Sequence, residues 1–277
     1  MRIDAHHHLW QYNQEEYDWI DDTMTLLKKN FLVKELKQTL ANNQIDGSIV
    51  VQARQSIEET NWLLSLAKDC DEIKGVVGWL DLKDDNLAHQ LRQCKTHQKL
   101  VGFRHVLQGE TDPNFMLDTK FIHGLKTLAE YDYCYDLLIY AHQLPTAIEM
   151  LKHVPNLRVV VDHIAKPNIQ TGEEFSRWQY GMKSLANNPN VYCKVSGMVT
   201  ETDWKHWQFA DFVPYLDAIF QHFGSERVMF GSDWPVCLVA GEYFEIKQII
   251  HDYLSTKDKN TINNVFGNNA AKFYQIS

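Results

Sequence analysis

The stretch Val159-Val160-Val161-Asp162-His163 holds three consecutive β-branched residues, followed at once by an acid and a histidine. Continuous apolar runs of this kind are typical of parallel strands that are covered on both faces, whereas a strand with one solvated face alternates. Ser48-Ile49-Val50-Val51 shows the same pattern nearer the start of the chain. Both runs predict buried parallel strands, and the polar pair after Val161 marks the end of one.

Eight apolar runs rich in valine, isoleucine and aromatic residues recur along the whole sequence. They predict strands near Arg2–His6, Gly47–Ala53, Gly75–Leu82, Leu100–Val106, Tyr135–Ala141, Leu157–Asp162, Val191–Ser196 and Arg227–Gly231. Apolar residues at helical spacing lie between the runs. They predict helices near Phe31–Asn42, Asn61–Lys68, Leu87–Cys94, Phe121–Tyr131, Leu144–Val154, Phe175–Asn187, Phe212–Phe223 and Tyr243–Leu254, with a last helix over Asn260–Tyr274.

Strand–helix alternation repeated eight times predicts an α/β fold, a (β/α)8 or TIM barrel with an additional C-terminal helix. A doubly wound open sheet shows the same alternation and is the alternative. The count of eight favours the barrel, and so does the lack of a Gly-rich phosphate turn after any run. The eight units use nearly all of the 277 residues, so we expect one domain over residues 1–277.

Composition and charge exclude some classes of protein. The 27 Lys and Arg residues face 36 Asp and Glu residues, a net charge of -9, which argues against a nucleic-acid partner. No apolar run approaches the roughly 18 residues of a membrane span, so we expect no membrane partner. The five cysteines are dispersed without a CxxC motif, which favours a reducing, cytoplasmic location.

The clearest chemical motif is Asp4-x-His6-x-His8 at the end of the first predicted strand. Catalytic groups of such barrels lie at the C-terminal ends of strands. Side chains two apart on a strand point the same way, so His6 and His8 converge. An imidazole pair suits a divalent ion such as zinc, and a carboxylate such as Asp233 would complete the site. The alternative is an exposed histidine-rich start.

The ends of other predicted strands carry further candidate site residues. Each of them has one chemical and one structural interpretation. Asp233, in Phe230-Gly231-Ser232-Asp233-Trp234-Pro235, could act as a general base on water or cap a helix. His163 could join the same site or serve as a core or capping residue. Arg104 and Lys194, both in apolar runs, could bind a substrate oxygen or form structural ion pairs.

Aromatic residues and amides near the strand ends complete the candidates. Four tryptophans, namely Trp79, Trp204, Trp207 and Trp234, could stack on a sugar ring or belong to the core. His142 follows the fifth run, although Gln143 could be the residue that faces the barrel instead. The long connections Gln11–Asn30 and Met198–Asp211 are rich in aromatic residues, and we expect them to cover the site.

Taken together, these motifs resemble the amidohydrolase superfamily, and more narrowly its lactonase branch, which includes sugar-lactone and pyrone-dicarboxylate lactone hydrolases. The resemblance rests on Asp4-Ala5-His6-His7-His8-Leu9-Trp10, Gly102-Phe103-Arg104-His105, Val161-Asp162-His163-Ile164-Ala165-Lys166-Pro167, Lys194-Val195-Ser196-Gly197, Phe230-Gly231-Ser232-Asp233-Trp234-Pro235 and Val265-Phe266-Gly267-Asn268-Asn269-Ala270. The motifs cover nearly the whole chain, and together they are specific for the branch and much less so for the substrate.

The resemblance implies a distorted barrel that opens a lactone by attack of water on its carbonyl. Asp233 would be the base, and Arg104 would contact substrate. His6, His8 and His163 would polarise the carbonyl or, with Asp233, hold a single divalent ion, zinc by preference. The branch also includes enzymes without metal, so both alternatives stay open. Two-metal members need a lysine or glutamate on the fourth strand, where this chain has Gly102-Phe103-Arg104-His105, so we do not expect a two-metal centre.

A sugar-acid lactone such as an L-fucono- or related aldonolactone is the small-molecule substrate we expect, because a dicarboxylate lactone would require more arginines than Arg54 and Arg104. The residues expected to contact substrate are Gln52, Trp79, His105, His142, Lys194 and Trp234. A metal-dependent decarboxylase of the same superfamily and a non-catalytic binding barrel are the alternatives. A homodimer is the assembly we consider.

Overall fold

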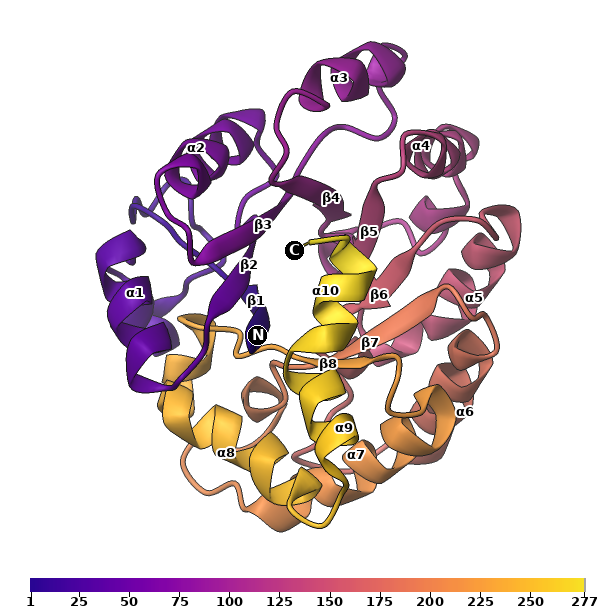
Figure 1. Cartoon of the computed structure of the whole chain (residues 1–277). Coiled ribbons are helices and arrows are strands. Elements are labelled where there is room, and N and C mark those ends of the chain that lie inside the picture. Colours follow the sequence, from indigo (N-terminus) through magenta and orange to yellow (C-terminus); the bar gives the residue numbers. More distant parts are fainter. Residues whose placement is uncertain (277) are drawn as a thin grey trace.

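Eight parallel strands form one sheet in the order β1 to β8 in the computed structural model, which describes residues 1–276. The strands are β1 (Ile3–His7), β2 (Gly47–Val51), β3 (Ile73–Gly78), β4 (Leu100–His105), β5 (Cys134–Leu137), β6 (Val159–Val161), β7 (Val191–Val195) and β8 (Val228–Phe230). Figure 1 shows helices around the outside of this ring of strands and the C-terminal helix across one end of it. The (β/α)8 barrel predicted from the alternation is confirmed.

One helix follows each strand, and two short helices end the chain. They are α1 (Val33–Asn42), α2 (Ile57–Lys68), α3 (Leu87–Cys94), α4 (Thr119–Glu130), α5 (Leu144–His153), α6 (Phe175–Ala186), α7 (Phe209–Phe223), α8 (Tyr243–Leu254), α9 (Lys259–Asn263) and α10 (Asn269–Tyr274). Within residues 1–276, no helix is both long and apolar enough to span a bilayer.

The barrel closes between its first strand, β1, and its last strand, β8. Fewer backbone hydrogen bonds join these two strands than join the other pairs of neighbouring strands. The amide of His8 donates to the carbonyl of Trp234 at 2.7 Å, and the amide of Asp233 donates to the carbonyl of His6 at 2.8 Å. Beneath them the buried carboxylate of Asp4 accepts hydrogen bonds from the amide and hydroxyl of Ser232, at 2.8 and 2.6 Å. We call this junction of β1 and β8 the seam.

The strands are buried because each is covered on both sides. Side chains that point into the barrel, such as Ile3, Ile49 and Val160, pack together with Phe273 of α10. The outward side chains pack against the surrounding helices in a second, larger cluster. This double burial accounts for the continuous apolar runs of the sequence.

The last helix differs from its prediction as one continuous segment. A five-residue π-helical turn (Asn264–Asn268) separates α9 from α10, which crosses the end of the barrel where the N-terminus lies (Figure 1). A Cβ atom on Gly267 would lie 2.1 Å from the carbonyl oxygen of Met1, so only glycine allows this approach. The break lets Phe273 and Tyr274 enter the barrel end.

Candidate active site

A cavity of about 670 Å³ opens at the C-terminal ends of the strands, as expected for a barrel of this kind. His8, Arg104, His163 and Asp233 line its inner part and are all almost fully buried. The outer part is lined by residues of the connections between strands and helices. The cavity therefore leads from solvent to the histidines and carboxylate singled out in the sequence.

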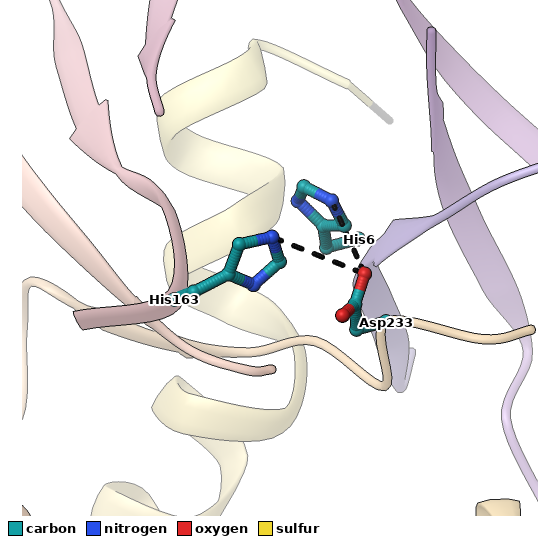
Figure 2. A group of neighbouring side chains, drawn as sticks. All are labelled: His6, His163 and Asp233. Carbon is teal, nitrogen blue, oxygen red and sulfur yellow. Dashed lines mark ion pairs between the residues drawn. The ribbon is translucent and has the colours of Figure 1, made fainter. Parts of the chain in front are cut away.

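Three imidazoles converge on one oxygen of Asp233. The Nε2 atoms of His6, His8 and His163 lie 3.7, 3.4 and 3.9 Å from Oδ1 of Asp233. Figure 2 shows His6 from β1 and His163 from the end of β6 turned toward Asp233, which follows β8. The structure thus brings together the four residues that the sequence proposed as a metal site, and we call them the imidazole–carboxylate cluster.

The spacing within this cluster suits a divalent ion. The Nε2 atoms of His6 and His8 are 3.2 Å apart. Two nitrogens that bind one tetrahedral zinc ion at roughly 2.0–2.1 Å would be separated by about 3.3 Å. His6, His163 and Asp233 also offer ligand atoms that all lie within 4.8 Å of one another. The cluster therefore has the donor types and the spacing of a single-ion site.

Partners of the other ring nitrogens favour the tautomers that metal binding needs. Nδ1 of His8 lies 2.7 Å from the carbonyl oxygen of Val51, and Nδ1 of His163 lies 2.9 Å from the hydroxyl of Ser196. Nδ1 of His6 lies 3.3 Å from Oδ1 of Asp162 and 3.0 Å from Nζ of Lys194. The carbonyl of Val51 can only accept, so the proton of His8 lies on Nδ1 and the lone pair of its Nε2 faces the cluster.

Burial keeps the imidazoles of His6 and His163 neutral, which is the form that binds a metal. It lowers the pKa of His163 to about 4 and the pKa of His6 well below its usual value. Burial alone would raise the pKa of Asp233, but the neighbouring rings of His163 and His8 outweigh it and lower that pKa. Asp233 is thus held as a carboxylate.

His163 reaches the cluster from an uncommon backbone turn. The four residues from His163 to Lys166 all have positive φ angles, between 47° and 60°. Such left-handed residues cost roughly 1–2 kcal/mol each unless their surroundings hold them. The indole Nε1 of Trp178 donates to the carbonyl of Ile164 at 2.7 Å, and Gly197 leaves room for the His163 ring.

Arg104 lies at the inner end of the cavity and is held by three neighbours. Its Nη1 donates to Asp162 Oδ2 at 3.1 Å and lies 3.4 Å from His6 Nε2. Its Nη2 donates to the carbonyl and to the side-chain oxygen of Gln52. The guanidinium is therefore fixed beside the cluster, and its Nε makes no hydrogen bond with residues 1–276.

Below the cluster, Lys194 joins a buried ion-pair network that stretches across the barrel. Its Nζ lies 2.5 Å from Asp136 Oδ2, 3.0 Å from Asp162 Oδ1 and 3.0 Å from Nδ1 of His6. Burial opposes ionisation of Asp162, but Lys194 outweighs it and holds the pKa of that carboxyl well below its usual value. His6, Asp136 and Asp162 could in principle hold a second cation, and the ammonium group of Lys194 already takes that place.

The six residues expected to contact substrate lie outside the lining of this cavity, and their contact with substrate stays a prediction. None of them belongs to the cavity lining that residues 1–276 provide. Gln52 orients Arg104, and Lys194 is fully buried in the ion-pair network. Trp234 is buried with its ring edge to face with Phe31, at 5.3 Å between ring centroids.

The other three of these six residues, His105, His142 and Trp79, pack against neighbouring residues and do not line the cavity themselves. His105 stacks on Phe115 and bonds Glu110 at 2.6 Å, because consecutive strand residues point to opposite sides and Arg104 takes the inward one. His142 stacks on Tyr140 with 5.8 Å between ring centroids. Trp79 follows β3, where its amide donates to the hydroxyl of Thr60 at 2.8 Å.

Several lining residues were not identified from the sequence. They come from the connections after β1, β5, β6 and β7, and include Glu16, Asp18, Trp19, Tyr140, Lys166 and Glu201, whereas Trp204 was a candidate for stacking on a sugar ring and does line the cavity. Aromatic content had marked the connections after β1 and β7 as covers, and both do supply lining residues. The individual side chains could not be found, because their approach depends on loop conformation.

The chain is similar to known proteins over almost its whole length. A family model described as Amidohydrolase matches residues 3–276. The chain belongs to the amidohydrolase family. Among similar amidohydrolases, an L-fucono-1,5-lactonase of Burkholderia multivorans is 36% identical over 289 residues, covering 100% of this chain and 96% of that protein.

Solved structures of amidohydrolases agree with the fold. A crystal structure of an amidohydrolase from Burkholderia multivorans with bound zinc superimposes with a TM-score of 0.97 at 36% identity, over 100% of both chains. A probable 2-pyrone-4,6-dicarboxylic acid hydrolase from Acinetobacter baumannii gives a TM-score of 0.80 at 17% identity, over 99% of each chain. The second likeness shows the shared fold alone.

Proposed function

We propose that this amidohydrolase opens the ring of a neutral sugar-acid lactone, such as an L-fuconolactone or a related aldonolactone, with Asp233 as the base. The observation that carries the proposal is the convergence of three imidazoles on the Asp233 carboxylate at the inner end of a cavity. Similarity to an L-fucono-1,5-lactonase supports the lactonase over the decarboxylase alternative.

Charge in the cavity supports a neutral substrate. The three cations that line it, Arg54, Arg104 and Lys166, are each within ion-pair distance of a carboxylate, at 2.7, 3.1 and 3.2 Å. A dicarboxylate lactone would have to compete with these carboxylates. The rings of Trp19 and Trp204 also line the cavity and suit the apolar face of a sugar ring.

The geometry assigns the proton transfers to Asp233. Its Oδ1 faces the imidazoles, and its Oδ2 makes no hydrogen bond with the described residues 1–276, so that oxygen can take a proton from water. The water oxygen then bonds to the lactone carbonyl carbon, and the bond from that carbon to the ring oxygen breaks. Asp233 returns the proton to the departing ring oxygen, which leaves a hydroxy acid.

His6, His8, His163 and Asp233 would hold a zinc ion, as the donor set and the spacing permit. Zinc bound there would supply Lewis acidity toward the lactone carbonyl and would lower the pKa of water. Arg104, fixed beside His6, would stabilise negative charge that develops on the carbonyl oxygen. Burial of the cluster excludes bulk water and so strengthens these interactions.

The proposal is tested by mixing the zinc-loaded protein with a panel of lactones and following acid release with a pH indicator. We expect neutral aldonolactones to be opened, with one proton released per ring. Replacing Asp233 by asparagine should lower the rate by roughly 10²–10⁴-fold, because a general base is lost.

Asp258→Asn is the matched control, since it makes the same change at the start of α9, and asparagine also caps helices. This variant should retain the full rate. Absence of lactone opening across the panel, or carbon dioxide release from an unsaturated or aromatic acid, would contradict the proposed function.

A further inference from the structure

The outer part of the cavity carries charged residues that the proposed reaction does not use. They are three carboxylates and two cations, namely Glu16, Asp18, Glu201, Arg54 and Lys166, and we call them the rim. Glu16 and Asp18 are exposed, whereas Asp233 is nearly buried, so the rim lies nearer to solvent than the imidazole–carboxylate cluster. A substrate must therefore pass the rim or rest against it.

Arg54 is held by acids from two sides. Its Nη1 lies 2.7 Å from Glu16 Oε1, and its Nε lies 3.9 Å from Oε1 of the buried Glu59. The carboxylate of Glu59 is fixed in turn by the amides of Ala53 and Arg54, at 2.9 and 2.8 Å. The guanidinium also lies over the ring of Tyr17, 5.3 Å from its centroid. Arg54 is thus a fixed cation whose outer face is covered by Glu16.

Lys166 forms a corresponding pair on another side of the cavity. Its Nζ lies 3.2 Å from Glu201 Oε1 and 5.4 Å from the centroid of the Tyr140 ring. Both side chains of the pair are largely buried, at 17% and 18% exposure, so solvent screens their attraction less than at an open surface. Glu201 also accepts a hydrogen bond from the hydroxyl of Thr200 at 3.2 Å.

We propose that the Glu16–Arg54 and Glu201–Lys166 pairs determine the charge specificity of the enzyme by selecting against lactones that carry a carboxylate. This inference rests on the proposed lactonase function and adds residues that set its substrate class. An anionic lactone would have to displace a glutamate from its cation and would also face the carboxylate of Asp18. A neutral sugar lactone does not have to displace a glutamate and is not repelled by Asp18, because its hydroxyls can form hydrogen bonds with carboxylates and cations alike.

The test compares two lactones of the same ring size and stereochemistry in the zinc-loaded enzyme. One is the best neutral aldonolactone, and the other carries a carboxylate at the terminal carbon of the same skeleton. The measured quantity is the ratio of kcat/KM for the carboxylated lactone to kcat/KM for the neutral one. In Glu16→Gln and in Glu201→Gln, we expect this ratio to rise by roughly tenfold or more, because each change frees a cation for a charged hydrogen bond.

Asp18→Asn is the matched control for a general loss of negative charge. Asp18 lies in the same rim and forms no ion pair with residues 1–276, so its replacement frees no cation. The ratio should therefore rise by only about twofold, as repulsion at a solvent-exposed site is weak. In Glu16→Gln/Arg54→Gln the gain of the single variant should disappear.

The outcomes separate this proposal from the function on which it rests. A wild-type enzyme that opens both lactones equally well would overturn the rim proposal and leave the lactonase intact. Asp18→Asn raising the ratio as much as Glu16→Gln would also overturn it, because charge alone would then account for the effect. If no lactone is opened at all, the proposed function itself fails.

Discussion

At the scale of single residues, the position of His163 depends on a neighbour without a side chain. Gly197 follows β7 with a φ angle of 58°, which glycine adopts without cost. A Cβ atom built there would lie 2.5 Å from Nδ1 of His163, far inside contact distance. The ring therefore keeps its direction toward Asp233 only because this position has no Cβ atom.

Gly197→Ala should consequently affect both stability and activity. We expect a loss of about 1–3 kcal/mol in the free energy of unfolding from backbone strain. Lactone opening should fall by roughly 100-fold, because the His163 ring is displaced from the cluster. Urea denaturation and kcat/KM measure the two effects.

Gly172→Ala is the control, since its φ angle is 66° and nothing lies within 4 Å of the added carbon. It should cost about 1 kcal/mol of stability and leave the rate as it was. Equal rates for the two alanine variants would contradict the positioning role of Gly197.

At the scale of elements, Lys194 ties several strands of the barrel together. It projects from β7 between Asp136 of β5 and Asp162, which directly follows β6, and the hydroxyl of Tyr274 from α10 donates to Asp136 at 3.0 Å. All of these side chains are buried, so bulk solvent does not screen their charges. Each carboxylate thus depends on the ammonium group for its stability in the barrel.

Replacing Lys194 by methionine should destabilise the fold by about 3–5 kcal/mol, because the buried Asp136 loses its counterion and Asp162 keeps only Arg104. Lys152→Met is the matched control, as Lys152 pairs with Glu149 at 2.6 Å on the exposed face of α5. That change should cost no more than about 0.5 kcal/mol. Urea denaturation measures both, and equal costs would show that the network does not hold the barrel.

The elements were largely predictable from sequence, whereas the cavity lining was not. Continuous apolar runs such as Val159–Val161 identify buried strands because burial on both faces removes the need for alternation. His6 and His8 were predicted to converge because strand side chains repeat every two residues. The same rule, applied across β4, would have separated the inward Arg104 from the outward His105, which were both expected at the site.

Loop residues could not be predicted by any periodic rule. Glu16 meets Arg54 and Lys166 meets Glu201 across 38 and 35 residues of sequence, through connections whose conformation no local pattern specifies. The break of the last helix at Gly267 likewise depends on a contact with Met1 at the other end of the chain. The division into one domain over residues 1–277 stays a prediction.

At the scale of the whole molecule, the imidazole–carboxylate cluster spans the seam at which the barrel closes. His6 and His8 belong to the β1 side of the seam, and Asp233 belongs to the β8 side. A zinc ion held by these side chains would join the first and last strands across their weakest pairing. Zinc binding would thus couple the active site to the stability of the closed barrel.

Zinc should therefore raise the thermal midpoint of unfolding. At a free concentration 100 times its Kd, a ligand bound only by the folded protein adds about 2.7 kcal/mol. For a chain of this length that corresponds to a rise in Tm of roughly 5 °C. Differential scanning calorimetry of the chelator-treated protein, before and after zinc is added, measures the shift. Magnesium, which prefers oxygen ligands, should produce little change. Asp233→Asn should lose most of the zinc effect, and an undiminished shift in that variant would place the ion elsewhere.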